Sequence, residues 1–386
     1  MVSKPAPGIL RLVRPDVLAM LGYEPIEPAH VVAERLGLTV DRIAKLDGNE
    51  NPYGPSPRVP EALAAYDGYH RYGDPKQTRL RQALAEYAGV GPEHVVAGHG
   101  SDELIDLLLR AVVTPGDTVV GCPPTFGMYA FSTRVAGGTT VVAERRDDFT
   151  LDLDAVLAAS QGDERTPNID SASQRDVREA SMPKAILVAS PNNPTGNRLS
   201  SDELDALLAT GLLVVVDEAY IEFAGGSVAG LVPERENLVV LRTFSKWAGL
   251  AGLRAGYGIM PRALADVLMH MKIPYNPNAA AETAMLVSLE DREALMERVA
   301  AIVDERERLA RELASLERFD VYPSETNFVL ARLRDGGDGR ELRDALAGRG
   351  VFVRHFDTPR LRDCLRISAG TPHETGLLLS ALREVL

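Results

Sequence analysis

The stretch LVVVDEAY, residues 213–220, places four apolar residues directly before two acids. Similar continuous apolar runs occupy Ala185–Ala189 and Leu238–Leu241, and segments with helical period separate runs of this kind. Strands of a parallel sheet have this pattern because helices cover both faces of the sheet and leave no face for polar residues. We therefore predict an α/β fold in which a mostly parallel sheet is flanked by helices.

Shorter segments extend the pattern towards the N-terminus. There we expect helices over Leu80–Tyr87 and Asp102–Val113, and strands over His94–Ala97, Thr118–Gly121 and Val141–Ala143. The charged, proline-free segment Ala279–Leu316 predicts one long helix. Beyond it we expect strands over Phe328–Leu330, Val351–Val353 and Leu365–Ser368, and helices over Arg340–Ala347 and His373–Val385.

These elements divide the chain into two expected domains. Residues 45–278 would form a large domain, and residues 279–386 a smaller α+β domain that begins with the long helix. Residues 1–44 would be an N-terminal arm or part of the smaller domain, against which we expect them to pack. The polar segment Gln161–Pro183 lacks periodicity, so it is expected to be a surface insertion.

Composition excludes several classes of function. The 386 residues carry a formal net charge of −13 and no long basic run, which argues against a nucleic-acid or anionic-membrane partner. The two cysteines, Cys122 and Cys364, lie too far apart to indicate a zinc site or a disulfide framework. The start shows no export signature and the apolar runs are too short to span a bilayer. We expect a soluble, cytoplasmic protein that binds no metal.

Several polar motifs follow the expected strands. Asp217 ends a buried strand, where ligands bind in open α/β sheets, and a buried acid is costly unless it meets a cation or a strong donor. The segment GHGSDE, residues 98–103, follows a strand and opens a helix, which suits an anion site or an ordinary helix cap. Because a carboxylate repels a phosphate, the side chain of Asp102 should point away or cap the helix.

Three further motifs add chemically distinct groups. Phe126 in PPTFGMY could stack on a flat heterocycle or fill the core, and Asn193 in SPNNPTG would be presented rigidly as a hydrogen-bond donor. Lys246 lies in RTFSKWAGLAGLR, residues 242–254, where almost no acid neutralises it or Arg254. Alone, that stretch suits a surface loop with two solvated cations. Together the motifs describe a receptor for a planar, phosphorylated, protonated ring that carries an aldehyde, which is pyridoxal 5′-phosphate (PLP).

The motifs GSDE, PPTFGMY, SPNNPTG, DEAY and SKWAGLAGLR, in this order and spacing, resemble those of fold-type I PLP-dependent aminotransferases. KLDGNENPYGPSP, YHRYGDPKQTRLRQALAEY, ETNFVL and VRHFDTPRLRDCLRISAGT are similar, more closely, to the histidinol-phosphate aminotransferases. The resemblance covers the whole chain except Gln161–Pro183.

The resemblance implies a role for each site residue. Lys246 would bond covalently to the cofactor aldehyde and act as the catalytic base. Asp217 would pair with the ring nitrogen, and Asn193 and Tyr220 would hydrogen-bond the ring's 3′ oxygen. The expected contacts of the phosphate and the rest of the ring are Gly100, Ser101, Asp102, Phe126, Thr243, Ser245 and Arg254. Tyr72 would complete the site of a second subunit, which implies a homodimer, and the expected substrate-binding residues are Arg366, Arg354 and Asn327.

By the same resemblance, the expected reaction converts histidinol phosphate and 2-oxoglutarate to imidazole-acetol phosphate and glutamate, a step of histidine biosynthesis. An aromatic amino-acid aminotransferase or a decarboxylase of a phosphorylated amino acid would keep the same cofactor residues. A PLP-binding regulator would need an attached DNA-binding domain, and the roughly 40 residues before Lys45 are too short and too weakly basic to form one.

Overall fold

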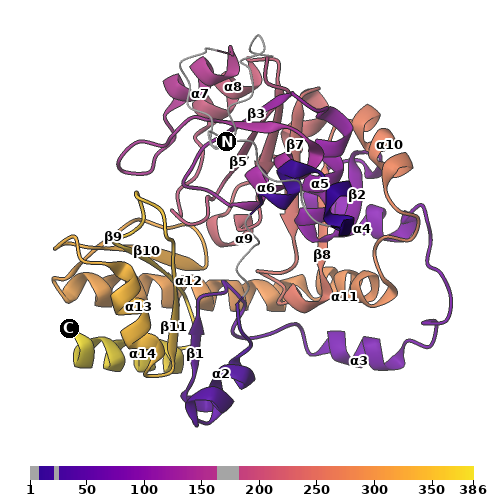
Figure 1. Cartoon of the computed structure of the whole chain (residues 1–386). Helices are drawn as coiled ribbons and strands as arrows, with labels where there is room; N and C mark the ends of the chain where they lie inside the picture. The colour runs from indigo at the N-terminus through magenta and orange to yellow at the C-terminus, as the bar shows by residue number, and fades with distance from the viewer. Residues whose placement is uncertain (1–7, 21–25, 163–181) are drawn as a thin grey trace.

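The computed structural model describes residues 8–20, 26–162 and 182–386. Within them the chain forms two β-sheets, each covered by helices, and the long helix α12 (Arg292–Ser315) runs from the larger unit to the smaller one (Figure 1). The expected insertion Gln161–Pro183 falls almost entirely outside the described residues. No helix of the described part is long and apolar enough to cross a membrane.

The larger sheet has seven strands in the order β2-β8-β7-β6-β5-β3-β4. All neighbouring pairs are parallel except those of β8, which runs antiparallel to β2 and β7, so the prediction of a mostly parallel sheet is confirmed. Its strands are β2 (Val95–His99), β3 (Thr118–Gly121), β4 (Thr139–Val142), β5 (Ala185–Ala189), β6 (Leu213–Asp217), β7 (Leu238–Thr243) and β8 (Ala255–Ile259).

The continuous apolar runs have the expected cause. In β6, Val214 and Val216 belong to one hydrophobic cluster, whereas Val215 belongs to the cluster on the opposite face. The helices of this unit are α3 (Arg58–Ala65), α4 (Thr78–Ala88), α5 (Gly100–Val112), α6 (Met128–Ala136), α7 (Leu153–Ser160), α8 (Ser201–Leu208), α9 (Ile221–Ala224), α10 (Arg262–Met271) and α11 (Ala279–Glu290). Since apolar side chains and helices cover both faces of the sheet, polar side chains can gather only at the ends of its strands.

The prediction of a single helix over Ala279–Leu316 is wrong. The segment forms α11 and α12, which meet at Asp291, where the backbone leaves helical geometry (φ −104°, ψ 21°). The hydroxyl of Ser56 donates to the Asp291 carboxylate, and α11 packs on α3 and α4 whereas α12 packs on β9 and β10. Helix α11 therefore belongs to the larger unit, whereas α12 begins in the core of the larger unit and ends in that of the smaller one, and a residue from a distant part of the chain contacts the break.

The smaller sheet has five strands in the order β1-β11-β12-β10-β9. Its strands are β1 (Ala44–Leu46), β9 (Phe319–Val321), β10 (Phe328–Leu333), β11 (Val351–His355) and β12 (Cys364–Ser368), covered by α13 (Gly339–Ala347) and α14 (Pro372–Val385). The first strand, β1, was not predicted, and it pairs parallel with β11. The chain thus contributes to this sheet before it enters the larger one.

The N-terminal segment contacts both units. Val32 and Ala33 of α2 (Ala29–Leu36) pack with Phe352 of the smaller sheet, as expected. Before α1 (Pro15–Leu18), however, Arg14 donates hydrogen bonds to the carbonyls of Arg134 and Val135 at the end of α6. The expectation that the whole segment packs on the smaller unit therefore holds for α2 and not for Arg14.

Candidate active site

A cavity of about 160 Å³ lies at the carboxyl ends of β5, β6 and β7. Most of the site residues predicted from the sequence line it, namely Ser101, Asp102, Phe126, Asn193, Asp217, Tyr220, Thr243, Ser245, Lys246, Arg254 and Arg366. Further lining residues include Ile26, Gly48, Asn49 and Tyr129. Motifs that are more than 260 residues apart in the chain thus meet in one place because parallel strands end at one edge of the sheet.

Lys246 follows β7 and points into this cavity. Burial lowers the pKa of its ammonium to about 8, and the positive charges of Arg366 and Arg254 act in the same direction. Its Nζ lies 3.4 Å from the carbonyl oxygen of Gly48 and 6.0 Å from the centre of the Tyr220 ring. A lysine with a lowered pKa is partly a neutral amine near pH 8, which is the form that attacks carbonyl groups.

Asp217 ends β6 and is only 5% exposed. Tyr129 Oη donates to its Oδ2 (2.7 Å), and the Ala219 backbone N–H donates to its Oδ1 (3.0 Å). Burial nevertheless raises the pKa of this carboxyl to about 6. Because both donors are neutral, a cationic group in the cavity would restore the charged carboxylate.

The N-terminus of α5 forms the other end of the cavity. Its first residue, Gly100, has φ +75°, and a Cβ there would lie 2.9 Å from Nη2 of Arg254. A Cβ on Gly256 of β8 would lie 2.7 Å from the backbone of Gly100 and of Ser101. Glycine is therefore required at both positions for the backbone N–H groups and the guanidinium to converge, as an anion site needs.

One expectation about this end is wrong. The side chain of Asp102 was expected to point away or cap the helix, but it forms an ion pair with Arg254. Nη2 of Arg254 lies 2.7 Å from Oδ2 of Asp102, so Arg254 also has an acidic partner. The side chains are 45% and 40% exposed, so this ion pair contributes little and can be exchanged for another anion. In the same cavity lining, Thr243 Oγ1 donates to Ser245 Oγ (2.9 Å), which fixes the position of the Ser245 hydroxyl.

Behind the cavity lies an enclosed ion pair. Nε of Arg242 in β7 donates to Oε2 of Glu218 over 3.0 Å, and Ser227 and the Val228 N–H also donate to this carboxylate. The pair joins the ends of β6 and β7, from which Asp217 and Lys246 project. A buried pair with this many hydrogen bonds holds the two strand ends in register.

The substrate side is formed by arginines of the smaller sheet. Arg366 donates to Asn193 Oδ1 (2.7 Å) and to the Asp47 carbonyl (2.5 Å), so the amide NH₂ of Asn193 is the group left to donate. Arg354 is the register partner of Arg366 on the neighbouring strand. It does not itself line the cavity, although it lies beside a residue that does.

Three other predicted residues lie outside the cavity lining. Asn327 is fully enclosed, and its Nδ2 donates to the carbonyl of Asn49 (3.1 Å). Tyr72 is 83% exposed and stacks on Tyr275, with ring centres 4.6 Å apart. Gly100 acts through its backbone. Conversely, Asn49 and Tyr129 line the cavity without a role predicted from the sequence, although they lie within the motifs KLDGNENPYGPSP and PPTFGMY.

The family model for aminotransferase class I and II matches residues 41–382. The chain belongs to this family. It is 49% identical, over 98% of its length and 99% of the relative's, to a histidinol-phosphate aminotransferase of Roseiflexus castenholzii. It is 42% identical to the chloroplastic histidinol-phosphate aminotransferase of Nicotiana plumbaginifolia, over 96% of this chain and 86% of that protein.

A solved structure agrees with this assignment. The histidinol-phosphate aminotransferase of Sinorhizobium meliloti in complex with pyridoxal 5′-phosphate superimposes with a TM-score of 0.82, at 29% identity, over 96% of both chains. The predictions of a fold-type I architecture and of an aminotransferase are therefore confirmed. In the described residues no group of three or more His, Cys, Asp or Glu side chains is placed to hold a metal ion.

Proposed function

We propose that this aminotransferase uses PLP to move the amino group of histidinol phosphate to 2-oxoglutarate, producing imidazole-acetol phosphate and glutamate. The observation that carries the proposal is the meeting of Lys246, Asp217 and the N-terminus of α5 in one cavity. The relatives named histidinol-phosphate aminotransferase, from a bacterium and a plant, support the choice of substrate.

The cavity suits the cofactor at both ends. Asp217 would hold a protonated ring nitrogen, because its buried carboxylate accepts hydrogen bonds only from neutral donors. The N-terminus of α5, Ser245 and Arg254 would hold the phosphate. Lys246 would provide the amine that binds the aldehyde. When bound, PLP withdraws electrons from the substrate's α-carbon into its ring.

Lys246 would also move the proton. Its amine, whose pKa burial lowers to about 8, would take a proton from the α-carbon of the substrate and deliver it to the carbon that carried the cofactor's aldehyde. A positioned general base of this kind contributes roughly 10²- to 10⁴-fold in rate. Because the amino donor and the 2-oxo acid would use the same residues in turn, the kinetics should be ping-pong.

The arginines explain how one site would accept two different anions. Arg366 lies in the cavity wall, with Arg354 beside it on the next strand. Planar guanidinium groups form paired hydrogen bonds with a phosphate and with a carboxylate. Histidinol phosphate carries the first group and 2-oxoglutarate the second. An aromatic amino acid would use the arginines only through its carboxylate.

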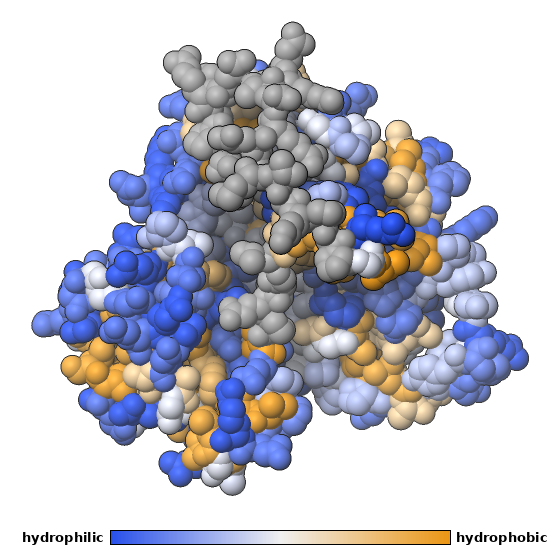
Figure 2. Space-filling model, viewed as in Figure 1, coloured by the Kyte–Doolittle hydropathy of each residue, from blue (hydrophilic) through white to orange (hydrophobic). Residues whose placement is uncertain are grey.

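We also propose that the enzyme is a homodimer in which Tyr72 enters the site of the partner subunit. Tyr72 is too exposed to serve its own site, and Ile273 (70%) and Met271 (40%) near it are exposed as well. Figure 2 shows hydrophobic residues on the surface in the region of α10, to which Met271 belongs. A second copy would cover these side chains.

The substrate is tested with single half-reactions. Loaded enzyme is mixed with histidinol phosphate, phenylalanine, tyrosine or glutamate, and the loss of the cofactor's absorbance band is followed without a 2-oxo acid. We expect the highest second-order rate constant for histidinol phosphate. A higher constant for phenylalanine or tyrosine would assign the enzyme to aromatic amino acids, and release of carbon dioxide from a phosphorylated amino acid would make it a decarboxylase.

A further inference from the structure

Asn49 lies between the smaller sheet and the wall of the active site. It is 1% exposed and has φ +51°, a left-handed conformation that asparagine tolerates better than most residues. It follows β1, the strand by which the chain first joins the smaller sheet. A buried asparagine in this conformation needs partners for both its amide and its backbone.

Residues in and next to the smaller sheet form hydrogen bonds with three atoms of Asn49. Its backbone N–H donates to Ser368 Oγ at the end of β12 (2.9 Å), and the same hydroxyl donates to Asn49 Oδ1 (2.9 Å). Its carbonyl accepts from Nδ2 of Asn327 (3.1 Å). Because Oδ1 is engaged by Ser368, the amide NH₂ points the other way.

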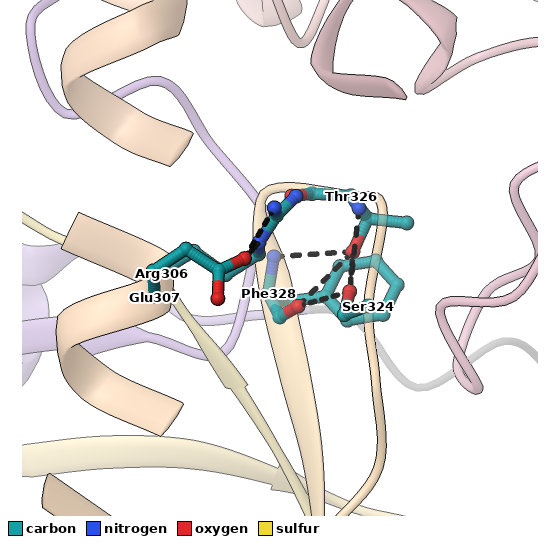
Figure 3. A network of polar contacts seen from close by, with 5 residues as sticks. All are labelled: Arg306, Glu307, Ser324, Thr326 and Phe328. Carbon is teal, nitrogen blue, oxygen red and sulfur yellow. Dashed lines mark hydrogen bonds and ion pairs between the residues drawn. The ribbon is translucent and has the colours of Figure 1, made fainter. Parts of the chain in front are cut away.

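The residues on either side of Asn327, Thr326 and Phe328, are held in a hydrogen-bonded turn (Figure 3). Arg306 Nη1 donates to the Thr326 carbonyl (2.8 Å), and Ser324 Oγ donates to the Phe328 carbonyl (2.6 Å). Glu307 pairs with the Arg306 guanidinium at 2.6 Å. The turn also contacts the larger unit, since the Glu325 N–H donates to the Gly196 carbonyl (2.8 Å). Asn49 therefore rests on a rigid support.

The free end of the Asn49 amide reaches the active site. Its Nδ2 donates to Tyr220 Oη over 2.9 Å, and the Tyr220 ring packs edge to face on Phe328, with centres 5.3 Å apart. A phenol oxygen that accepts a hydrogen bond keeps its own proton for donation to another acceptor. The contact therefore fixes the Tyr220 oxygen as an acceptor towards Asn49, so a hydrogen bond donated by the phenol must run in another direction.

We propose that Asn49 is a positioning residue that orients the Tyr220 hydroxyl to donate a hydrogen bond to the cofactor's ring oxygen. The inference rests on the proposed function, because that oxygen belongs to PLP. It assigns to Ser368, Asn327 and the Ser324–Phe328 turn a shared task, which is to hold the amide in place. The smaller sheet would thereby influence the cofactor without touching it.

The first test is a double-mutant cycle on the PLP dissociation constant of the full-length enzyme. Asn49→Gly removes the amide and keeps the left-handed backbone accessible. It should raise the dissociation constant about fivefold to tenfold, the effect of one buried hydrogen bond, and less than about twofold when Tyr220 is already Phe. Equal effects in both backgrounds would overturn the proposal, since Asn49 would then act only on the fold. Tyr220→Phe without effect on affinity would overturn it as well.

The second test reverses the polarity of the contact. In Asn49→Asp a carboxylate of the same shape accepts from Tyr220, so the phenol proton is turned away from the cofactor. The pH midpoint of the bound cofactor's absorbance change should move upward, because a donor to the ring oxygen favours the form that has lost its proton. An unchanged midpoint in both Asn49→Asp and Asn49→Gly would contradict the proposal. Neither readout needs substrate, so an error in the choice of histidinol phosphate would leave both results interpretable.

Discussion

The buried carboxylate of Asp217 should destabilise the cofactor-free protein at neutral pH. Its pKa in the folded chain is raised to about 6, from an ordinary value of 3.8, because the side chain is removed from water. The folded form therefore holds the proton more tightly than the unfolded form. Stability is unaffected below pH 3.8, falls as the pH rises from there to about 6, and stays reduced above that.

The size of the effect follows from the two pKa values. A difference of about 2 units, at about 1.4 kcal/mol per unit, lowers the unfolding free energy by about 3 kcal/mol at pH 8. Asp217→Asn cannot ionise and should recover this amount at pH 8 and almost nothing at pH 4. With 386 residues and about 2.1 cal/mol/K of unfolding entropy per residue, the gain corresponds to about 4 °C in melting temperature.

Urea unfolding and thermal melts of the cofactor-free protein at several pH values measure this gain. Tyr129→Phe is the companion variant, because the Tyr129 hydrogen bond lowers the pKa of Asp217, and its loss should extend the pH-dependent window upward. With PLP bound, Asp217→Asn should lower the unfolding free energy and not raise it, because the carboxylate's ion pair with the cationic ring is lost. A gain in stability that is independent of pH, or a loss at pH 8 without cofactor, would refute the reasoning.

Two further outcomes are expected. Gly256→Ala should cost at least about 1–3 kcal/mol of stability and weaken PLP binding, because its methyl group would meet the backbone of Gly100 and Ser101, which cannot move aside. Gly230→Ala, whose methyl group would meet nothing within 4 Å, is the matched control, and equal losses in both would contradict this reasoning. In a mixed dimer of one Tyr72→Phe subunit and one Lys246→Ala subunit, the subunit that keeps Lys246 has a partner that keeps Tyr72, whereas the other site lacks both. We expect one intact site per mixed dimer, and PLP affinities that ignore the partner's Tyr72 would exclude a shared site.

The strands that the sequence predicts best are those with one uninterrupted apolar run. β5 and β6 bury side chains on both faces, so local composition alone reports their environment. β8 escaped prediction because its sequence, AGYGI, is rich in glycine. Gly256 is required by the approach of α5, and that contact is invisible in the local sequence. The break at Asp291 has a similar cause, since its partner Ser56 lies in a distant segment.

The candidate active site likewise combines residues that the local sequence indicates with residues whose contacts depend on the fold. The placement of Lys246 and Asp217 at the cavity could be predicted because Asp217 ends a buried strand and Lys246 follows another, each within a recognisable motif. The roles of Asn49 and Tyr129 could not, because they depend on which side chains the fold brings beside them. The pairing of Arg254 with Asp102 was missed for a related reason. Charges were compared along the chain, whereas the partner comes from the first turn of α5.

Two ionisable groups of the cavity, Asp217 and Lys246, have pKa values shifted towards their neutral forms. Burial raises the pKa of Asp217 and lowers that of Lys246, so the protein around the cavity disfavours a negative charge at Asp217 and a positive charge at Lys246. A ligand with a protonated ring nitrogen would stabilise the charged carboxylate of Asp217. The neutral amine of Lys246 is the form that can bond covalently to an aldehyde. Arg254 differs from these two groups because it is half exposed and is paired with the carboxylate of Asp102, which another anion can replace. We therefore expect the cavity to receive a cationic ring beside Asp217 and an anion beside Arg254.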